Sequence, residues 1–326
     1  MRDPVLGIDI SKKTFDVTLL AGESKHGGSF DNNKSGFRGL SNWLRKLGIP
    51  SVHACMEATS TYGDDLAEYL YGKGHIVYMV NPARIKAYGV SQGLRVKNDK
   101  IDSTLIAQFC KYQEKLTEFE PLSPTLKTLR FLGRRLDDLK KELVREKNRI
   151  QSTTLPAEVL SSNRRHIGFL VKEIKRIESK IDELIDSDPD LKEKRALLLT
   201  IDGIGPASSR IFITEFRGFD NFETASQAAA YAGWTPFNRS SGSSLDVSGR
   251  ISRMGRAQIR AVTYMAAVAS VRCNSRLGAL YLSLIGRGKS KKLALCAIAR
   301  HLVHIAFGVL RSGKPYDPNY VRPVFA

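Results

Sequence analysis

Residues 5–20 read VLGIDISKKTFDVTLL, and this stretch decides the class of the N-terminal fold. Val5–Ile10 is a short apolar run, Thr14–Leu20 is rich in β-forming residues, and Ser11–Lys13 separates the two. Two runs of this length around a tight connection predict a pair of antiparallel strands. The stretch therefore predicts a sheet that begins with a hairpin.

Strand and helix patterns alternate from the hairpin to about residue 120. Strands are expected at Val52–Met56 and Ile76–Val80, the second halted by Asn81 and Pro82, and helices at Phe37–Leu47, Tyr62–Tyr71 and Ile101–Tyr112. A hairpin followed by such alternation indicates an α/β domain with a mixed sheet over residues 1–120.

Residues 121–190 carry a different pattern, in which apolar residues recur in steps of three and four. The first series is Leu129, Leu132, Leu136, Leu139 and Leu143; the second, after a break at Pro156, is Ile167, Leu170, Ile174, Ile177, Ile181 and Leu184. Heptad seams with charged residues between them predict coiled-coil helices. The spacing fits an antiparallel hairpin and also an arm that dimerises with another chain.

The basic residues are concentrated at the C-terminal end. The chain of 326 residues has 51 Lys and Arg against 33 Asp and Glu, and residues 191–326 hold 20 of the former and 7 of the latter. An apolar share of 42% excludes a disordered basic tail, so a folded domain that binds a polyanion, most simply nucleic acid, is predicted.

Other protein classes fit poorly. Arg300, His301 and His304 interrupt the apolar run Leu293–Leu310, which predicts a buried helix and no membrane span. Asp3 and Pro4 stand where a signal peptide would need a long apolar stretch, and the four cysteines form no Cys-x-x-Cys pair. We therefore expect a reduced cytoplasmic compartment and no secretion.

The last third of the chain is expected to be mostly α-helical. Gly203-Ile204-Gly205 lies between two apolar helical segments, as in a helix-hairpin-helix, where small residues let backbone N–H groups reach a phosphate. A purely structural turn would have the same pattern. Gly203, Gly205, Arg250, Arg253 and Arg256 are the candidate nucleic-acid-binding residues.

Four acidic residues occupy unusual places. Asp9 lies inside an apolar strand, where an uncompensated carboxylate is costly, and Glu57 ends another predicted strand. Asp99 and Asp102 are one turn apart at the start of a predicted helix. These oxygens could converge on Mg²⁺, although helix capping and solvent exposure would explain Glu57, Asp99 and Asp102 one by one. A metal bound between carboxylates and phosphate oxygens serves phosphoryl transfer.

The chain contains, in order, GIDISK around Asp9, MEATSTY around Glu57, KNDKIDS around Asp99 and Asp102, the heptad hairpin, GIG and SSGSS. This ordered set resembles the insertion sequence 110 family of transposases, whose relatives include Piv-type DNA invertases. The resemblance implies a RuvC-like domain of the RNase H fold over residues 1–120, a coiled-coil dimerisation arm over 121–190 and a transposase domain over 191–326. It implies that Asp9, Glu57, Asp99 and Asp102 bind Mg²⁺, with Mn²⁺ as a substitute, and that Ser241 is the nucleophile.

The same resemblance implies the partners. These are double-stranded target and donor DNA, a structured bridge RNA that pairs with both, and further copies of the chain in a dimer of dimers. It also implies a prokaryotic, nucleoid-associated protein.

Two other functions remain open on the sequence. A RuvC-type resolvase would cut DNA with water and form no covalent adduct, and a non-catalytic nucleic-acid-binding protein would use its acidic residues only structurally. An ATP-dependent kinase is disfavoured, because Gly286–Ser290 and Gly203–Gly205 both lack the glycines and the preceding strand of a nucleotide-binding loop.

Overall fold

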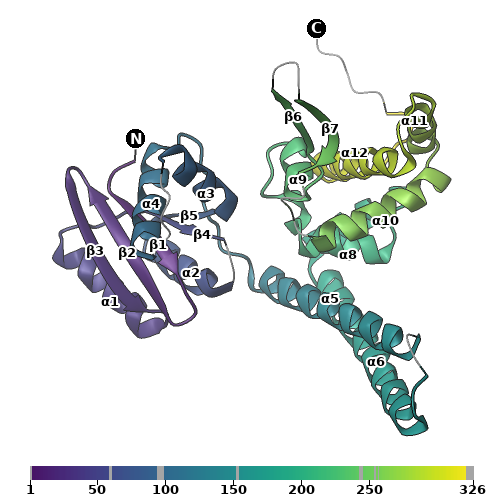
Figure 1. The fold of residues 1–326 in the computed structure, drawn as a ribbon, viewed down its shortest axis with the longest axis horizontal. Coiled ribbons are helices and arrows are strands. Elements are labelled where there is room, and N and C mark those ends of the chain that lie inside the picture. Colours follow the sequence, from purple (N-terminus) through teal and green to yellow (C-terminus); the bar gives the residue numbers. More distant parts are fainter. Residues whose placement is uncertain are drawn as a thin grey trace. The chain divides into compact units, whose positions relative to one another are not determined.

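The computed structural model divides into two compact units, Met1–Leu122 and Ser123–Ala326 (Figure 1). It describes residues 2–58, 61–93, 99–151, 154–241, 245–252, 255 and 257–320, with the side chains of 61, 99–101, 237–241 and 245–250 outside that description. The second unit contains both the heptad segment and the basic C-terminal segment.

A five-stranded mixed sheet forms the centre of the first unit, in the order β3-β2-β1-β4-β5. The strands are β1 (Val5–Ile10), β2 (Thr14–Ala21), β3 (Ser24–Asp31), β4 (His53–Glu57) and β5 (Ile76–Val80). β2 runs antiparallel to β1 and to β3, whereas β4 runs parallel to β1 and to β5. The predicted hairpin and the mixed sheet are therefore both present.

Helices cover both faces of this sheet (Figure 1). On one face, α1 (Lys34–Lys46) and α2 (Asp64–Gly72), the latter preceded by the 3-10 turn Thr61–Gly63, pack on side chains such as Leu6 and Ile8. On the other, α3 (Pro82–Ser91) and α4 (Asp99–Tyr112) pack on Val5, Cys55 and Tyr78. Alternate residues of β1 therefore face different helices.

Two elements of this unit differ from the sequence-based expectation. Strand β3, SKHGGSFD, is mostly exposed at the sheet edge, so it shows no apolar alternation. Pro82 does not merely halt β5 but is the first residue of α3, with the Asn81 side chain accepting a hydrogen bond from the Ala83 N–H at 2.9 Å. Proline is favoured at this position because its missing N–H would have no helical partner.

The second unit begins with the two long heptad helices, α5 (Pro124–Gln151) and α6 (Ala157–Ser187). Lys140 pairs with Glu178 at 2.7 Å, and Glu146 lies 3.5 Å from His166. Because later residues of α5 meet earlier residues of α6, the helices run antiparallel. Of the two arrangements that fit the heptad spacing, this is the antiparallel hairpin.

The remainder of the second unit is mostly helical, with one small sheet. Its elements are α7 (Pro189–Leu199), α8 (Pro206–Thr214), the 3-10 helix Arg217–Phe219, α9 (Ala225–Tyr231), β6 (Pro236–Ser241), β7 (Leu245–Ile251), α10 (Ala257–Cys273), α11 (Ser275–Gly286) and α12 (Lys291–Ser312). Phe212, Phe216 and Phe219 stack in its core. By length and composition α12 could cross a membrane, but Ile298, Leu302 and other residues of it are buried in this core.

Ion pairs connect the coiled coil to α7 and α8. Arg210 donates two hydrogen bonds to Asp182, at 2.8 and 2.6 Å, and Arg195 lies 3.1 Å from the same carboxylate. Burial alone would raise the pKa of Asp182, but the hydrogen bonds and charges of these two arginines lower it overall. The carboxylate is therefore held in its charged form.

Candidate active site

Asp9 and Glu57 belong to neighbouring parallel strands and stand at the same level. The β1–β4 register pairs Gly7 with Cys55 and Ile8 with Met56, so one further step brings Asp9 beside Glu57. Cys55 belongs to the core under α4, and Glu57, two residues later, points to the same face of the sheet. Carboxyl ends of parallel strands are where α/β proteins place their ligands.

Helix α4 crosses this face in close contact with β1. A Cβ atom on Gly7 would lie 2.2 Å from the Ser103 carbonyl oxygen and 2.3 Å from the Ala107 nitrogen. Thr18 pairs with Gly7 across the hairpin, and its hydroxyl oxygen lies 3.0 Å from the hydroxyl oxygen of Ser103. Glycine at position 7 is therefore what allows the helix to approach the strand.

The other two predicted ligands lie at the start of α4. Asp102 precedes the buried Ser103 and is half-buried, and Asp99 stands one turn earlier, at the first residue of the helix. Positions 99, 102, 103 and 106 share one side of a helix. The fold thus brings Asp9, Glu57 and the first turn of α4 to one face of one sheet.

Asp16 is an acidic residue on this face that the sequence reasoning did not single out. It is the cross-strand partner of Asp9 in the hairpin and is likewise half-buried. Directly opposed residues of an antiparallel pair point to the same face, with Cβ atoms about 5 Å apart. Asp16, like Asp9, is a charged residue in a predicted strand, and the register of the hairpin is the signal that places it opposite Asp9.

The donor set suits a hard divalent cation, because it consists of carboxylate oxygens alone. Among the side chains that the structure describes, no three acidic, histidine or cysteine residues form a complete ligand cluster, and the Asp99 side chain lies outside them. Asp9 is half-buried, because it lies one residue from the end of β1.

Ser241 lies in the second unit, at the end of one strand of a two-stranded sheet. It is the last residue of β6 and pairs with Leu245 of β7, while its side chain is outside the description. The base of this hairpin is fixed to α10 and α12. Trp234 Nε1 donates to the Thr263 hydroxyl at 2.8 Å, and Arg300 donates to the Trp234 carbonyl at 3.4 Å.

The two glycines between α7 and α8 have different surroundings. Gly203 has φ +97°, and a Cβ atom there would lie 2.0 Å from the Ser270 hydroxyl of α10, so its backbone conformation and its packing both account for a glycine. Gly205 is exposed and a Cβ atom would meet nothing within 4 Å. Arg250 lies in β7, whereas Arg253 and Arg256 fall outside the described residues.

Known proteins match almost the whole chain. A transposase model for the DEDD domain of IS110 elements matches residues 6–156, and a model described as transposase of the IS116/IS110/IS902 family matches residues 195–282. Pilin gene-inverting proteins of Moraxella bovis and Moraxella lacunata are each 30% identical over 320 residues, which span 97% of this chain and 98% of theirs. An IS110 element protein of Streptomyces coelicolor is 26% identical over 141 residues, 43% of this chain and 34% of its own. The chain therefore belongs to the IS110 family of transposases, and the Moraxella pilin gene-inverting proteins are its relatives.

Proposed function

We propose that this protein is a DNA recombinase that cuts and exchanges strands between a donor and a target site. The observation that carries the proposal is the common face of Asp9, Glu57 and the first turn of α4, produced by the β1–β4 register and by the close approach at Gly7. Family membership and the basic second unit support DNA as the substrate.

Asp9, Glu57, Asp99 and Asp102 are the residues that would hold Mg²⁺, with Mn²⁺ as a substitute. When bound, such an ion polarises a phosphate oxygen and offsets the charge that develops on it. The protein's own part is to keep four carboxylates on one sheet face and one helix turn. Gly7 positions that turn, and Asp16 adds negative charge beside Asp9.

Ser241 is the proposed nucleophile. Its hydroxyl gives up a proton and attacks the scissile phosphorus, forming a phosphoserine bond while the 3′ oxygen leaves and takes up a proton. The 3′-hydroxyl of an exchanged strand then attacks the phosphoserine, which forms the new phosphodiester and releases Ser241. Because one bond replaces another at each step, no ATP is needed.

The partners proposed for this reaction are those of the family resemblance. A structured bridge RNA selects the donor and the target by base pairing, and the coiled coil joins chains into a dimer of dimers. Each active site then combines the carboxylates of one chain with the serine of another. The protein would act on chromosomal DNA in the cytoplasm.

Trapping the covalent intermediate tests this proposal. The full chain is incubated with its guide RNA, Mg²⁺ and end-labelled donor and target DNA, and adducts are resolved by denaturing electrophoresis. Ser241→Ala is expected to abolish the adduct, and the matched variant Ser240→Ala is expected to retain it. An adduct that survives in Ser241→Ala, or disappears only in Ser240→Ala, assigns the nucleophile to another residue.

The products separate the proposal from its two alternatives. Rejoined hybrid strands are expected, whereas cut strands with free 5′-phosphate ends and no adduct would establish hydrolysis by activated water. Asp9→Asn is expected to abolish cleavage while leaving DNA binding intact. Cleavage at the wild-type rate in this variant would make the carboxylates structural and overturn the proposal.

A further inference from the structure

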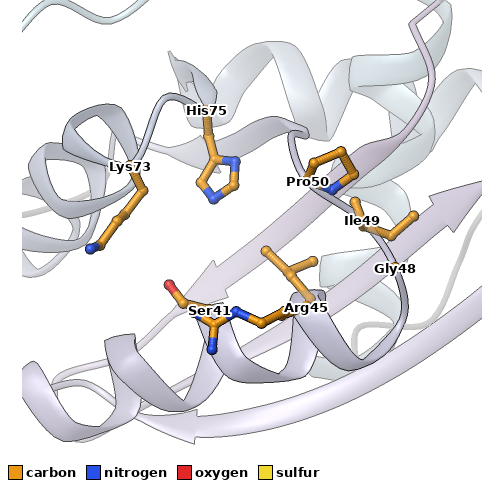
Figure 2. Close-up of a pocket in the computed structure, with 8 residues that line it drawn as sticks. Ser41, Arg45, Gly48, Ile49, Pro50, Lys73 and His75 are labelled. Atoms are coloured by element: carbon orange, nitrogen blue, oxygen red, sulfur yellow. The ribbon is translucent and has the colours of Figure 1, made fainter.

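A cavity of about 470 Å³ opens in the first unit, on the side of the sheet that α1 and α2 cover (Figure 2). Side chains from three segments line it: Ser41 and Arg45 of α1, Ile49 and Pro50 from the connection to β4, and Lys73 and His75 from the connection between α2 and β5. Among the described residues that line this cavity there is no carboxylate. Its lining therefore combines cationic and apolar groups.

His75 gives the cavity an unmet hydrogen-bonding group. The residue is only 8% exposed, and its Nδ1 atom has no hydrogen-bond partner among the residues that the structure describes. Burial lowers the pKa of His75, so the ring is neutral near pH 7 and one of its nitrogens carries a proton. Nδ1 itself has almost no accessible surface, whereas the other ring nitrogen, Nε2, points into the cavity, where a ligand oxygen could hydrogen-bond to it (Figure 2).

Two cations at the cavity have donors suited to an anion. Arg45 donates to Asn42 Oδ1 at 3.1 Å, and since a guanidinium has five N–H groups, others are left for a ligand. The Lys73 ammonium lies 5.7 Å from the centre of the Tyr69 ring and is exposed. Both residues stand at helix C-termini, where a positive charge stabilises the dipole, but that effect explains neither the hollow nor the unpartnered nitrogen of His75.

The cavity is separate from the acidic site. Residues 48–50 and 73–75 lead into the N-terminal ends of β4 and β5, whereas Glu57 lies at the C-terminal end of β4. The two sites also face opposite sides of the sheet, because α1 and α2 cover one and α4 covers the other. A ligand in the cavity is thus not the reacting phosphate.

We propose that this cavity binds a backbone phosphate of a nucleic-acid strand, with Arg45, Lys73 and His75 on its oxygens and the attached sugar against Ile49 and Pro50. Arginine and lysine are the usual phosphate ligands of nucleic-acid-binding proteins, and the apolar wall suits a phosphate that carries a sugar rather than a free ion. The first unit then holds the nucleic-acid strand at this cavity as well as at the acidic site. The proposal rests on the proposed function only in taking nucleic acid as the source of the phosphate.

The salt dependence of binding tests it. Affinity of the full chain for a fluorescent single-stranded oligonucleotide is measured by anisotropy over a range of salt concentrations. Each lost phosphate contact lowers the slope of log K against log salt by about 0.7. Arg45→Gln and Lys73→Gln are each expected to lower the slope by that amount. Lys46→Gln, an exposed neighbour in the same helical turn that does not line the cavity, is expected to leave it unchanged.

A direct reading comes from the ring nitrogens of His75, observed by NMR in the uniformly ¹⁵N-labelled chain, with the other five histidines as internal references. The oligonucleotide is expected to shift the His75 signals in the wild type and not in Lys73→Gln. An unchanged slope in Arg45→Gln, or an equal loss in Lys46→Gln, overturns the proposal. Equal affinity for inorganic phosphate would also overturn it, because the site would then take a free anion.

These results are independent of strand exchange. If the proposed function fails, the serine adduct is missing while the cavity variants still change the salt slope. If only the cavity proposal fails, the adduct forms and the slope is that of the wild type.

Discussion

Replacing Gly7 with alanine is expected to push α4 away from β1 and to misalign the acidic residues. The added Cβ atom would lie 2.2 Å from the Ser103 oxygen, where ordinary contact begins at 3.4 Å. Both nearest atoms are backbone, so no side chain can rotate away and the helix itself must move by about 1 Å. Overpacking of this kind costs about 1–3 kcal/mol of unfolding free energy. A displacement of 1 Å at the reacting groups costs about 10²-fold in rate.

The measurement pairs urea denaturation with DNA cleavage on the same preparation of the full chain. Gly27→Ala is the control: it replaces a glycine of the same sheet with alanine, and its nearest new contact is the Val17 oxygen at 3.8 Å. We expect Gly7→Ala to lose about 10²-fold in cleavage under conditions where it is still folded, and Gly27→Ala to keep its rate. Wild-type stability and cleavage in Gly7→Ala would refute the claim that this contact positions the acidic residues.

Three further predictions follow from described contacts. Asp16→Asn is expected to raise the Mg²⁺ concentration needed for half-maximal cleavage by about tenfold, because it removes a negative charge opposite Asp9. An unchanged Mg²⁺ titration would exclude Asp16 from the site. Gly203→Ala is expected to destabilise the chain by about 1–3 kcal/mol, since the new Cβ collides with Ser270, whereas Gly205→Ala is expected to be close to neutral. Equal effects of the two substitutions in thermal unfolding would contradict the packing explanation. Burial lowers the pKa of His53, His75, His301 and His304 in the folded protein. Below about pH 6.5 the unfolded chain therefore binds more protons than the folded one, and the free energy of unfolding is expected to fall as the pH is lowered. A flat profile of unfolding free energy between about pH 7.5 and 5.5 would contradict this.

The parts of the fold that the sequence predicted are those with a strong local pattern. The hairpin of residues 5–20 has two β-forming runs around a short turn, and the seams of α5 and α6 repeat over several heptads. Asp9 and Glu57 stood out because each carries a charge in an apolar strand. Their juxtaposition then followed from the parallel pairing of β1 with β4.

The parts that the sequence did not predict depend on contacts between distant segments. β3 is held by pairing with β2 rather than by its own apolar face, and β6, with the sequence PFNRSS, has no apolar alternation of its own and pairs with β7. Asp16 became visible only through its register with Asp9. The sequence leaves open whether Gly203 gives room to a phosphate or belongs to a structural turn, because the neighbour that requires a glycine there, Ser270, is 67 residues away in the chain.

The bidentate bond between Arg210 and Asp182 has a mechanical consequence for the long hairpin arm. It clamps α6 to α8 near the base of the arm, with Arg195 of α7 on the same carboxylate. From Asp182 to the first residue of α6 the helix extends roughly 38 Å at 1.5 Å per residue. A stiff rod clamped at one end acts as a lever, so a small sideways force at its tip is delivered as a torque on the turn that contains Gly203 and Gly205.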